Sequence, residues 1–319
     1  MKEIRIGEKD AGQRLDKFLK KYLRAATGGF LYKMLRKKNI TLNGGRAEGK
    51  ECLKEGDTVR IFFSDETLEK MRGAGSFEQS SGSGGEKKSP QPAFDGLKVV
   101  YEDEDLLIVD KPAGLLSQGD KSGEASVNDW LLARFGKTEN GFAPAVANRL
   151  DRNTSGLLLC ARSYAGSRFL SEQIKNHGIR KFYLAIAEGH MDGEGVLRGF
   201  WRKDERENKV VIDPAGSHKN ITETEGVYVE TRYRVLEASD AHSLLEVELI
   251  TGRSHQIRAH LASIGHPLAG DIKYGGHVFC GKRMQQLQAY RLVFPELSGS
   301  FERLSGRCFE AEKRVTLPL

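Results

Sequence analysis

The residues best suited to chemistry surround Asp151, in the segment 147–156 that reads ANRLDRNTSG and precedes an apolar run at 157–161. Asp151 lies between Arg149 and Arg152, and neighbouring cations favour the ionised form of a carboxylate even at the edge of a core. Such a group could serve in catalysis. From local composition alone, however, a structural ion pair or a turn is the commoner role of such an aspartate.

A second polar cluster lies in the segment 249–271, LITGRSHQIRAHLASIGHPLAGD. Its pattern predicts a strand, a Thr-Gly turn, and a helix that ends at Gly265 and Pro267. Arg253 would then lie at the helix entrance. The histidines His255 and His260 are five residues apart, and the chain has neither an H-E-x-x-H motif nor a supporting pair of cysteines, so we expect no metal site. These histidines are expected to order the loop by hydrogen bonds or to contact phosphates.

Between the two clusters, residues 180–189 alternate as a β-strand does. Phe182 and Tyr183 would point to opposite faces, so Tyr183 faces a cleft if Phe182 faces the core. A tyrosine that is half-buried on a sheet is nevertheless the commoner case.

The elements nearer the N-terminus carry the positive charge of the chain. Residues 14–23 and 30–38 show helical apolar spacing, and two strand-like segments, 40–42 and 59–63, follow them. Residues 13–50 contain eleven Lys or Arg against two acidic residues, a local charge of +9 in a chain whose net charge is +6. The rest of the chain therefore carries −3, and the small basic segment has the character of a site for a polyanion. A solvated helix face is the alternative for either helix taken alone.

Composition excludes several other classes of protein. The chain has 319 residues, 39% of them hydrophobic and 29% charged, with no apolar run near the roughly 20 residues that a bilayer requires. Four scattered cysteines without a C-x-x-C pair favour neither disulfides nor a zinc ribbon. Motifs for ATP, dinucleotides and serine hydrolases are missing. We therefore expect a cytoplasmic protein that is a monomer, needs no cofactor and does not bind a membrane.

A Gly/Ser-rich stretch at 72–92 divides the chain. The predicted organisation is a small basic domain at 1–64, a flexible linker at 65–92, and a large domain at 93–319.

The motifs together resemble known families. The patterns RLDKFL, MLRKKNITLNG and LKEGDTV within residues 12–63 resemble the small RNA-binding domain first recognised in ribosomal protein S-four. NRLDRNTSGLLL around Asp151, KFYLAIAEG around Tyr183, and TGRSHQIRAHLASIGHPLAGD with the following KYG resemble the RluA/RluC/RluD-type RNA pseudouridine synthases, as does YEDEDLLIVDKPAG at 101–114.

The resemblance implies a fold of the α+β class, with a mixed, largely antiparallel central sheet, flanking helices and loops, and a small α/β RNA-binding domain at the N-terminus. It also implies isomerisation of specific uridines to pseudouridine in structured RNA, with large-subunit ribosomal RNA as the expected partner. Asp151 would be the essential catalytic carboxylate, Arg253 would pair with it, and Tyr183 would stack on the uracil. Arg149 would fill the space left by the flipped base. The residues expected to contact RNA in the small domain are Arg14, Lys17, Lys33, Arg36, Lys37 and Lys38.

The chain departs from the family pattern at three places where a histidine is common: Asn148, Ser117-Gln118 and Gln288. None of them removes the predicted site residues. Two alternatives stay open, a non-catalytic RNA-binding or ribosome-assembly protein and, more weakly, a glycoside hydrolase, for which a second paired carboxylate is missing from the motifs.

Overall fold

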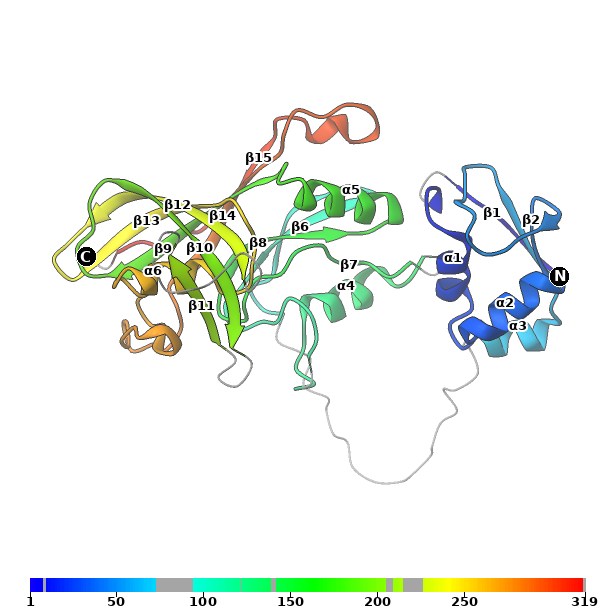
Figure 1. Cartoon of the computed structure of the whole chain (residues 1–319), viewed down its shortest axis with the longest axis horizontal. Coiled ribbons are helices and arrows are strands. Elements are labelled where there is room, and N and C mark those ends of the chain that lie inside the picture. Colours follow the sequence, from blue (N-terminus) through cyan, green and yellow to red (C-terminus); the bar gives the residue numbers. More distant parts are fainter. Residues whose placement is uncertain are drawn as a thin grey trace, which may run out of the picture.

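A computed structural model describes residues 1–7, 10–72, 94–120, 122–138, 142–204, 209–214 and 226–317. The chain forms a small N-terminal module and a larger domain built on one extended sheet (Figure 1). The helices are α1 Leu15–Tyr22, α2 Gly28–Arg36, α3 Asp65–Arg72, α4 Val127–Phe135, α5 Tyr164–Lys175 and α6 Gln256–Ser263.

The N-terminal module is a four-stranded antiparallel sheet with three helices. Its strand order is β1-β4-β2-β3, with β1 Lys2–Arg5, β2 Ile40–Leu42, β3 Gly45–Arg46 and β4 Thr58–Ile61. Asn43 and Gly44 form the β2–β3 turn with φ of 50° and 74°, as an Asn-Gly hairpin turn requires. The apolar residues predicted to form one stripe of the first helix, among them Leu15, Phe18 and Leu19, are fully buried in this module's core.

The predicted boundary of this module was wrong at its C-terminal side. Residues 65–72 were expected to belong to the flexible linker, but they form α3, whose Leu68 and Met71 pack on the module's core. Ser64 accepts a hydrogen bond from the backbone N–H of Thr67 and so caps the first turn. The Gly/Ser-rich stretch at 73–92 lies outside the described residues.

The larger domain is built on an eleven-stranded sheet with the order β11-β10-β12-β13-β9-β14-β8-β6-β5, to which β15 adds on β14 and β7 on β8. Its strands are β5 Lys98–Glu102, β6 Leu106–Lys111, β7 Ala145–Val146, β8 Ser155–Ala161, β9 Arg180–Glu188, β10 Glu194–Asp204, β11 Lys209–Pro214, β12 Val227–Ala238, β13 His242–Leu249, β14 Leu287–Val293 and β15 Cys308–Glu310. Among the pairs formed by these described strands, only β14–β8 is parallel. The predicted mixed, largely antiparallel sheet is confirmed.

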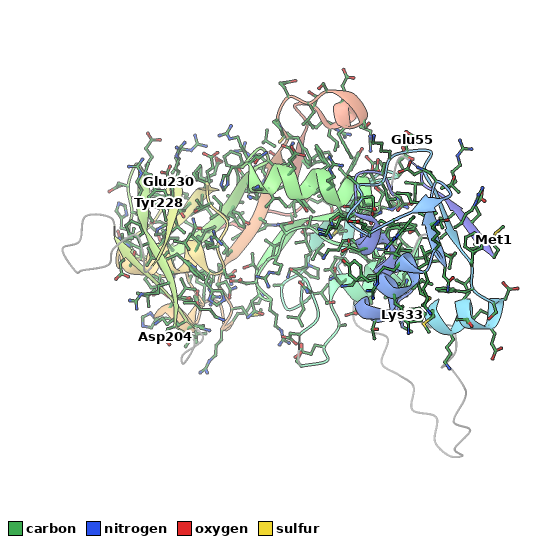
Figure 2. The ribbon with its side chains drawn as sticks, turned by 45° about the vertical axis from the view of Figure 1, so that its right-hand side comes forward. Met1, Lys33, Glu55, Asp204, Tyr228 and Glu230 are labelled. Atoms are coloured by element: carbon green, nitrogen blue, oxygen red, sulfur yellow. The ribbon has the colours of Figure 1, made fainter. Side chains whose placement is uncertain are left out.

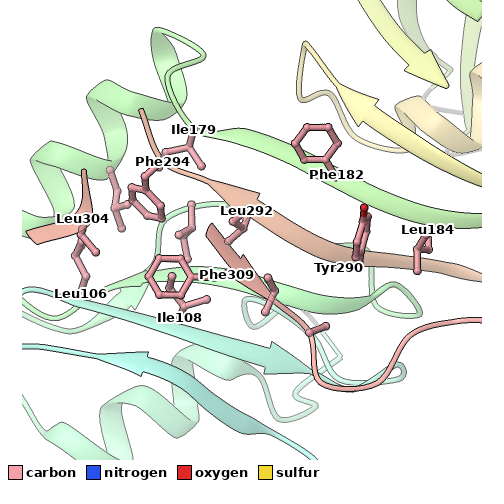
Figure 3. Packing of buried hydrophobic residues seen from close by; sticks show 14 of the residues in the cluster. Leu106, Ile108, Ile179, Phe182, Leu184, Tyr290, Leu292, Phe294, Leu304 and Phe309 are labelled. Carbon is pink, nitrogen blue, oxygen red and sulfur yellow. The ribbon is translucent and has the colours of Figure 1, made fainter. Parts of the chain in front are cut away.

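Both faces of the central strands are buried. Phe182 and Leu184 of β9 lie in one core cluster with Tyr290, Leu292 and Phe309, as Figure 3 shows. Tyr183 and Ala185, which alternate with them, lie in the second cluster on the other face, beside α4 and α6. The predicted alternation of β9 is therefore confirmed, and the face that carries Tyr183 is the one that the site shares.

Lys21 of α1 contacts the larger domain, with its Nζ 4.2 Å from the ring centroid of Tyr164. Within the described residues, no helix is long and apolar enough to cross a bilayer.

Candidate active site

A large groove crosses the face of the sheet that carries Tyr183. Its volume is about 1310 Å³, and all four residues predicted for the site, Arg149, Asp151, Tyr183 and Arg253, line it. The loop between β7 and β8, strand β9 and the N-terminal end of α6 supply these residues. Segments more than 100 residues apart in the sequence thus meet in one place.

The sheet register explains why Asp151 and Tyr183 come together. Gly156 at the start of β8 pairs with Ala289 of β14, and Ala289 pairs with Tyr183 of β9. Gly156 has φ of 109°, and a Cβ there would lie 2.1 Å from the carbonyl oxygen of Ala289. Only glycine tolerates both conditions, so this residue lets β8 approach β14 directly after the loop that carries Asp151.

The loop that carries Asp151 is held by buried polar contacts. Ser117 Oγ donates to the carbonyl of Leu150 and accepts from its N–H, at 2.9 and 3.0 Å. Asn148 Oδ1 accepts from the N–H of Leu159 at 3.0 Å. The side-chain amide of Gln288 binds the backbone of Lys313 and Val315 instead. The three departures from the family pattern therefore have structural partners in this chain.

Lys111 supports the same loop from beneath. Its side chain is fully buried, and its Nζ donates to the carbonyl oxygens of Pro112, Leu115 and Arg152 at 2.8–3.0 Å. Burial lowers the pKa of Lys111 to about 8, against the opposing effect of Asp151.

The partner of Asp151 is Arg258, and the predicted pairing with Arg253 is wrong. Arg258 Nη1 donates to Asp151 Oδ2 at 3.0 Å, while its Nε and Nη2 donate to the two oxygens of Asp271 at 2.6 and 2.8 Å. The side chain of Asp151 is 24% exposed, that of Arg258 8% and that of Asp271 2%. One buried guanidinium therefore bridges a groove-facing carboxylate to a buried one.

The charge of Arg258 is secured by these contacts. Burial by itself would lower the pKa of Arg258, but Asp271 and Asp151 together raise it. The guanidinium also lies 4.9 Å from the ring centroid of Tyr274. Asp151 is thus oriented by a cation that Asp271 and Tyr274 hold in place.

His255 is the second basic side chain next to Asp151. It caps α6 in a left-handed conformation with φ of 55°, and its Nε2 is 3.7 Å from Asp151 Oδ2. Its Nδ1 is 2.9 Å from the hydroxyl of Tyr274, which accepts from the N–H of Val210. Burial lowers the pKa of His255 more than Asp151 raises it. The lowered pKa leaves the His255 ring neutral at physiological pH, with Nε2 facing Asp151.

The other two histidines of this segment form hydrogen bonds to neighbouring strands, His260 to a side chain of β12 and His266 to the backbone of β9. His260 Nδ1 is 2.8 Å from Thr231 Oγ1, and His266 Nδ1 is 2.8 Å from the carbonyl of Glu188. Among the described residues no group of three or more His, Cys, Asp or Glu is arranged to hold a metal ion.

Tyr183 is buried on the sheet beside Asp151. Burial, with a further contribution from the charge of Asp151, raises the pKa of its hydroxyl. The phenol is therefore neutral at physiological pH and can donate a hydrogen bond, while its ring forms part of the groove wall.

The two arginines next to Asp151 in the sequence do not bind it. Arg152 forms an ion pair with Glu124, with its Nη1 3.0 Å from Glu124 Oε1, and donates from Nε to the carbonyl of Gly114. Arg149 and Arg253 are exposed on the groove wall, and none of the ion pairs found within the described residues uses them. Both side chains are therefore available for a ligand.

The predicted RNA-contacting residues of the N-terminal module are all exposed, but one differs from the rest. Arg14 precedes α1 and donates from Nε and Nη2 to Asp16, at 3.1 and 2.9 Å. The others lie on or directly after α1 and α2, without an ion pair among the described residues: Lys17, Lys33, Arg36, Lys37 and Lys38. Figure 2 labels Lys33 on this module.

Comparison with known proteins decides the family. A family model described as RNA pseudouridylate synthase matches residues 105–263, which contain Asp151, Tyr183 and Arg258. Ribosomal large subunit pseudouridine synthase C of Vibrio cholerae is 32% identical over 86% of this chain and 81% of that protein. The chain belongs to the RNA pseudouridine synthase family. A second relative of this synthase, ribosomal large subunit pseudouridine synthase D of Nitrosomonas europaea, is 30% identical over 86% of this chain and 72% of that protein.

Solved structures agree with this family assignment. The human RNA pseudouridylate synthase domain containing 1 has 25% sequence identity and a TM-score of 0.50, over 67% of this chain and 82% of that one. The human RNA pseudouridylate synthase domain containing 4, at 21% identity, has a TM-score of 0.51 over 67% of this chain and 88% of that one. The synthase therefore has the predicted pseudouridine synthase fold.

Proposed function

We propose that this synthase isomerises specific uridines of large-subunit ribosomal RNA to pseudouridine, with Asp151 as the essential carboxylate. The alignments with the relatives named for that substrate extend over 86% of this chain and 72–81% of those proteins. The observation that carries the assignment of Asp151 is its ion pair with the buried Arg258 at the floor of the groove.

The reaction is a rearrangement and balances without an oxidant or a co-substrate. The bond between C1′ of the ribose and N1 of uracil breaks, a bond between C1′ and C5 forms, C5 loses a proton and N1 gains one. The site must therefore supply a reactive carboxylate, hold the detached uracil and exclude water. The ion pair with Arg258 keeps Asp151 oriented towards the groove.

The other groove residues have roles that fit their positions. Tyr183, neutral and next to Asp151, stacks on the uracil and can assist proton transfer at its carbon. A uridine in structured RNA must leave its helix to reach Asp151, which costs a few kcal/mol of unstacking. The exposed guanidinium of Arg149 is planar and is our candidate to fill the vacated stack. Arg253, which does not bind Asp151, is placed to contact the RNA backbone.

The direct test is incubation of the purified synthase with uridine-labelled ribosomal RNA in the absence of any cofactor. We expect pseudouridine from the wild type and none from Asp151→Asn, with RNA binding retained within a few-fold. Asp192→Asn is the matched control, because Asp192 is exposed and pairs with His190 away from the groove.

Two results would overturn the proposal. Turnover by Asp151→Asn near the wild-type rate would remove Asp151 from the chemistry. A wild type that binds this RNA but never forms pseudouridine would favour the competing function, a non-catalytic RNA-binding or ribosome-assembly protein.

A further inference from the structure

The groove extends well beyond the site around Asp151. Its volume of about 1310 Å³ exceeds the roughly 300–1,000 Å³ typical of pockets for single small molecules. The acidic residues that line the groove are Asp120 and Asp151. The cationic residues that line it are more numerous: Arg149, Lys175, Lys181, Lys203, Arg253 and Arg258. Size and charge together fit a segment of polyanion longer than one nucleotide.

One aromatic side chain of the groove lies away from Asp151. Trp201 of β10 is half-buried on the face of the sheet that packs against α6, and it contacts the cluster around Val210 and Tyr274. Its indole Nε1 donates to the carbonyl of Ser254 at 3.0 Å. The ring is thereby fixed to the loop that also carries Arg253 and His255.

A cation lies beside this ring. Lys203 is two residues after Trp201 on β10, so both side chains are on the same face of the strand. Register confirms this, because Trp201 pairs with Ile212 and Lys203 with Val210, both buried residues of β11. Lys203 is exposed and lines the groove. Lys203 has no ion pair among the described residues, and an immobilised aromatic face with an adjacent ammonium group is the combination that binds a base and its phosphate in single-stranded nucleic acid.

We propose that Trp201 and Lys203 form a second nucleotide subsite, which binds a nucleotide flanking the uridine to be isomerised. The flanking base stacks on the indole of Trp201, and its phosphate pairs with Lys203. This inference rests on the proposed function, since it takes the uridine to be at Asp151. Because stacking depends on the ring face, the subsite accepts more than one base and contributes affinity.

The first test uses Trp201 as its own reporter. The chain has two tryptophans, so Trp130→Phe combined with Asp151→Asn leaves Trp201 as the only indole and prevents turnover. Titration with a short single-stranded RNA that contains one uridine should quench its fluorescence. Abasic replacement of the neighbour on one particular side of the uridine should abolish the quenching, and replacement on the other side should preserve it. Quenching that is unaffected by either replacement would overturn the proposal.

The second test separates stacking from support of the Ser254 loop. Trp201→Ala should weaken RNA binding about 5- to 100-fold, mainly as a higher KM, whereas Trp201→Phe should retain most of the affinity because it keeps a ring. If Trp201→Phe were as damaging as Trp201→Ala, the side chain would act through its hydrogen bond to Ser254 and the subsite would be refuted. Lys203→Gln should lower the salt dependence of binding by about one phosphate contact.

These results also separate this proposal from the proposed function. A wild type that forms pseudouridine while Trp201→Ala has an unchanged KM refutes the subsite alone. A wild type that forms no pseudouridine refutes the proposed function, whatever Trp201 does.

Discussion

At the scale of single residues, the site is organised around one buried guanidinium. Arg258 contacts Asp151 on the groove side and Asp271 on the interior side. A buried arginine needs carboxylate partners to compensate for its lost hydration, and here one of those partners is the proposed catalytic group. The catalytic carboxylate and the stability of the domain therefore depend on the same contact.

Replacement of Asp271 by Asn tests this dependence. The variant should lose about 1.5–3 kcal/mol of unfolding free energy, because a charged, buried hydrogen-bond pair becomes a weaker one. Since Arg258 is then less firmly held, kcat should fall about 10- to 100-fold while KM changes little. Denaturant unfolding and steady-state kinetics measure the two effects. An unchanged kcat in a destabilised variant would show that Asp271 is purely structural.

His260 gives a pH dependence whose sign follows from its burial. Burial lowers the pKa of His260 to about 4, so the folded chain keeps this ring neutral where the unfolded chain protonates it. The contribution of the neutral His260 ring to the free energy of unfolding is therefore fully present above a pH of about 6.5. It is lost as the pH falls towards 4, and it amounts to on the order of 3 kcal/mol in all.

His260→Asn preserves a polar partner for Thr231 and removes this titration. Unfolding free energies measured between these pH limits should fall less steeply for the variant than for the wild type. If the unfolding free energies of the two proteins fell equally with pH, His260 would not be the source of this pH dependence.

The sequence predicted which side chains share the groove but not how they pair. Asp151, Tyr183, Arg149 and Arg253 were all expected at one site, and all four line one groove. The pairing partner was missed because a sequence does not show which of two arginines is buried. A signal existed, since Arg258 lies within one helical turn of the buried Ile257 and Leu261. Asp271, the second carboxylate it needs, follows in the same motif.

At the scale of elements, the site depends on how closely β8 approaches β14. Gly156 opens β8 at the one parallel pairing among the described strands, directly after the loop that holds Asp151. The sequence predicted β9 and helix α6 from local patterns. It did not predict that β14, more than 100 residues later, is inserted between β8 and β9, because that pairing is decided by tertiary packing.

Gly156→Ala tests this approach. The added Cβ would meet the backbone of Ala289, so we expect a loss of more than about 2 kcal/mol of unfolding free energy, with reduced activity. Gly114→Ala is the matched control, because Gly114 has φ of 93° but no atom within 4 Å of its added Cβ. Equal destabilisation by both would mean that backbone strain, rather than the contact with β14, is responsible.

At the scale of the whole molecule, the excess positive charge and the proposed catalytic carboxylate lie in different domains. The basic segment lies in the N-terminal module, whereas the proposed reaction depends on the single negative charge of Asp151 in the larger domain. Local charge in the sequence predicted this division, and helical patterns predicted α1 and α2. Helix α3 was not predicted, because its few apolar residues, Leu68 and Met71, lie next to the Gly/Ser-rich stretch.

The role of the module is tested by salt dependence. Lys33→Ala combined with Lys37→Ala should weaken binding to ribosomal RNA and lower the slope of log affinity against log salt by about 1.4–1.8, as expected for two phosphate contacts. Lys54→Ala combined with Lys70→Ala removes the same charge from exposed positions outside α1 and α2. If both double variants changed the slope equally, α2 would not be a specific RNA contact.

The central claim is that this chain forms pseudouridine in ribosomal RNA through Asp151. It is tested most directly by mapping pseudouridines in the large-subunit RNA of cells that lack the gene and express either the wild type or Asp151→Asn. We predict that discrete sites lose their pseudouridine without the gene, regain it with the wild type, and stay unmodified with Asp151→Asn. Restoration of the same sites by Asp151→Asn would contradict the account.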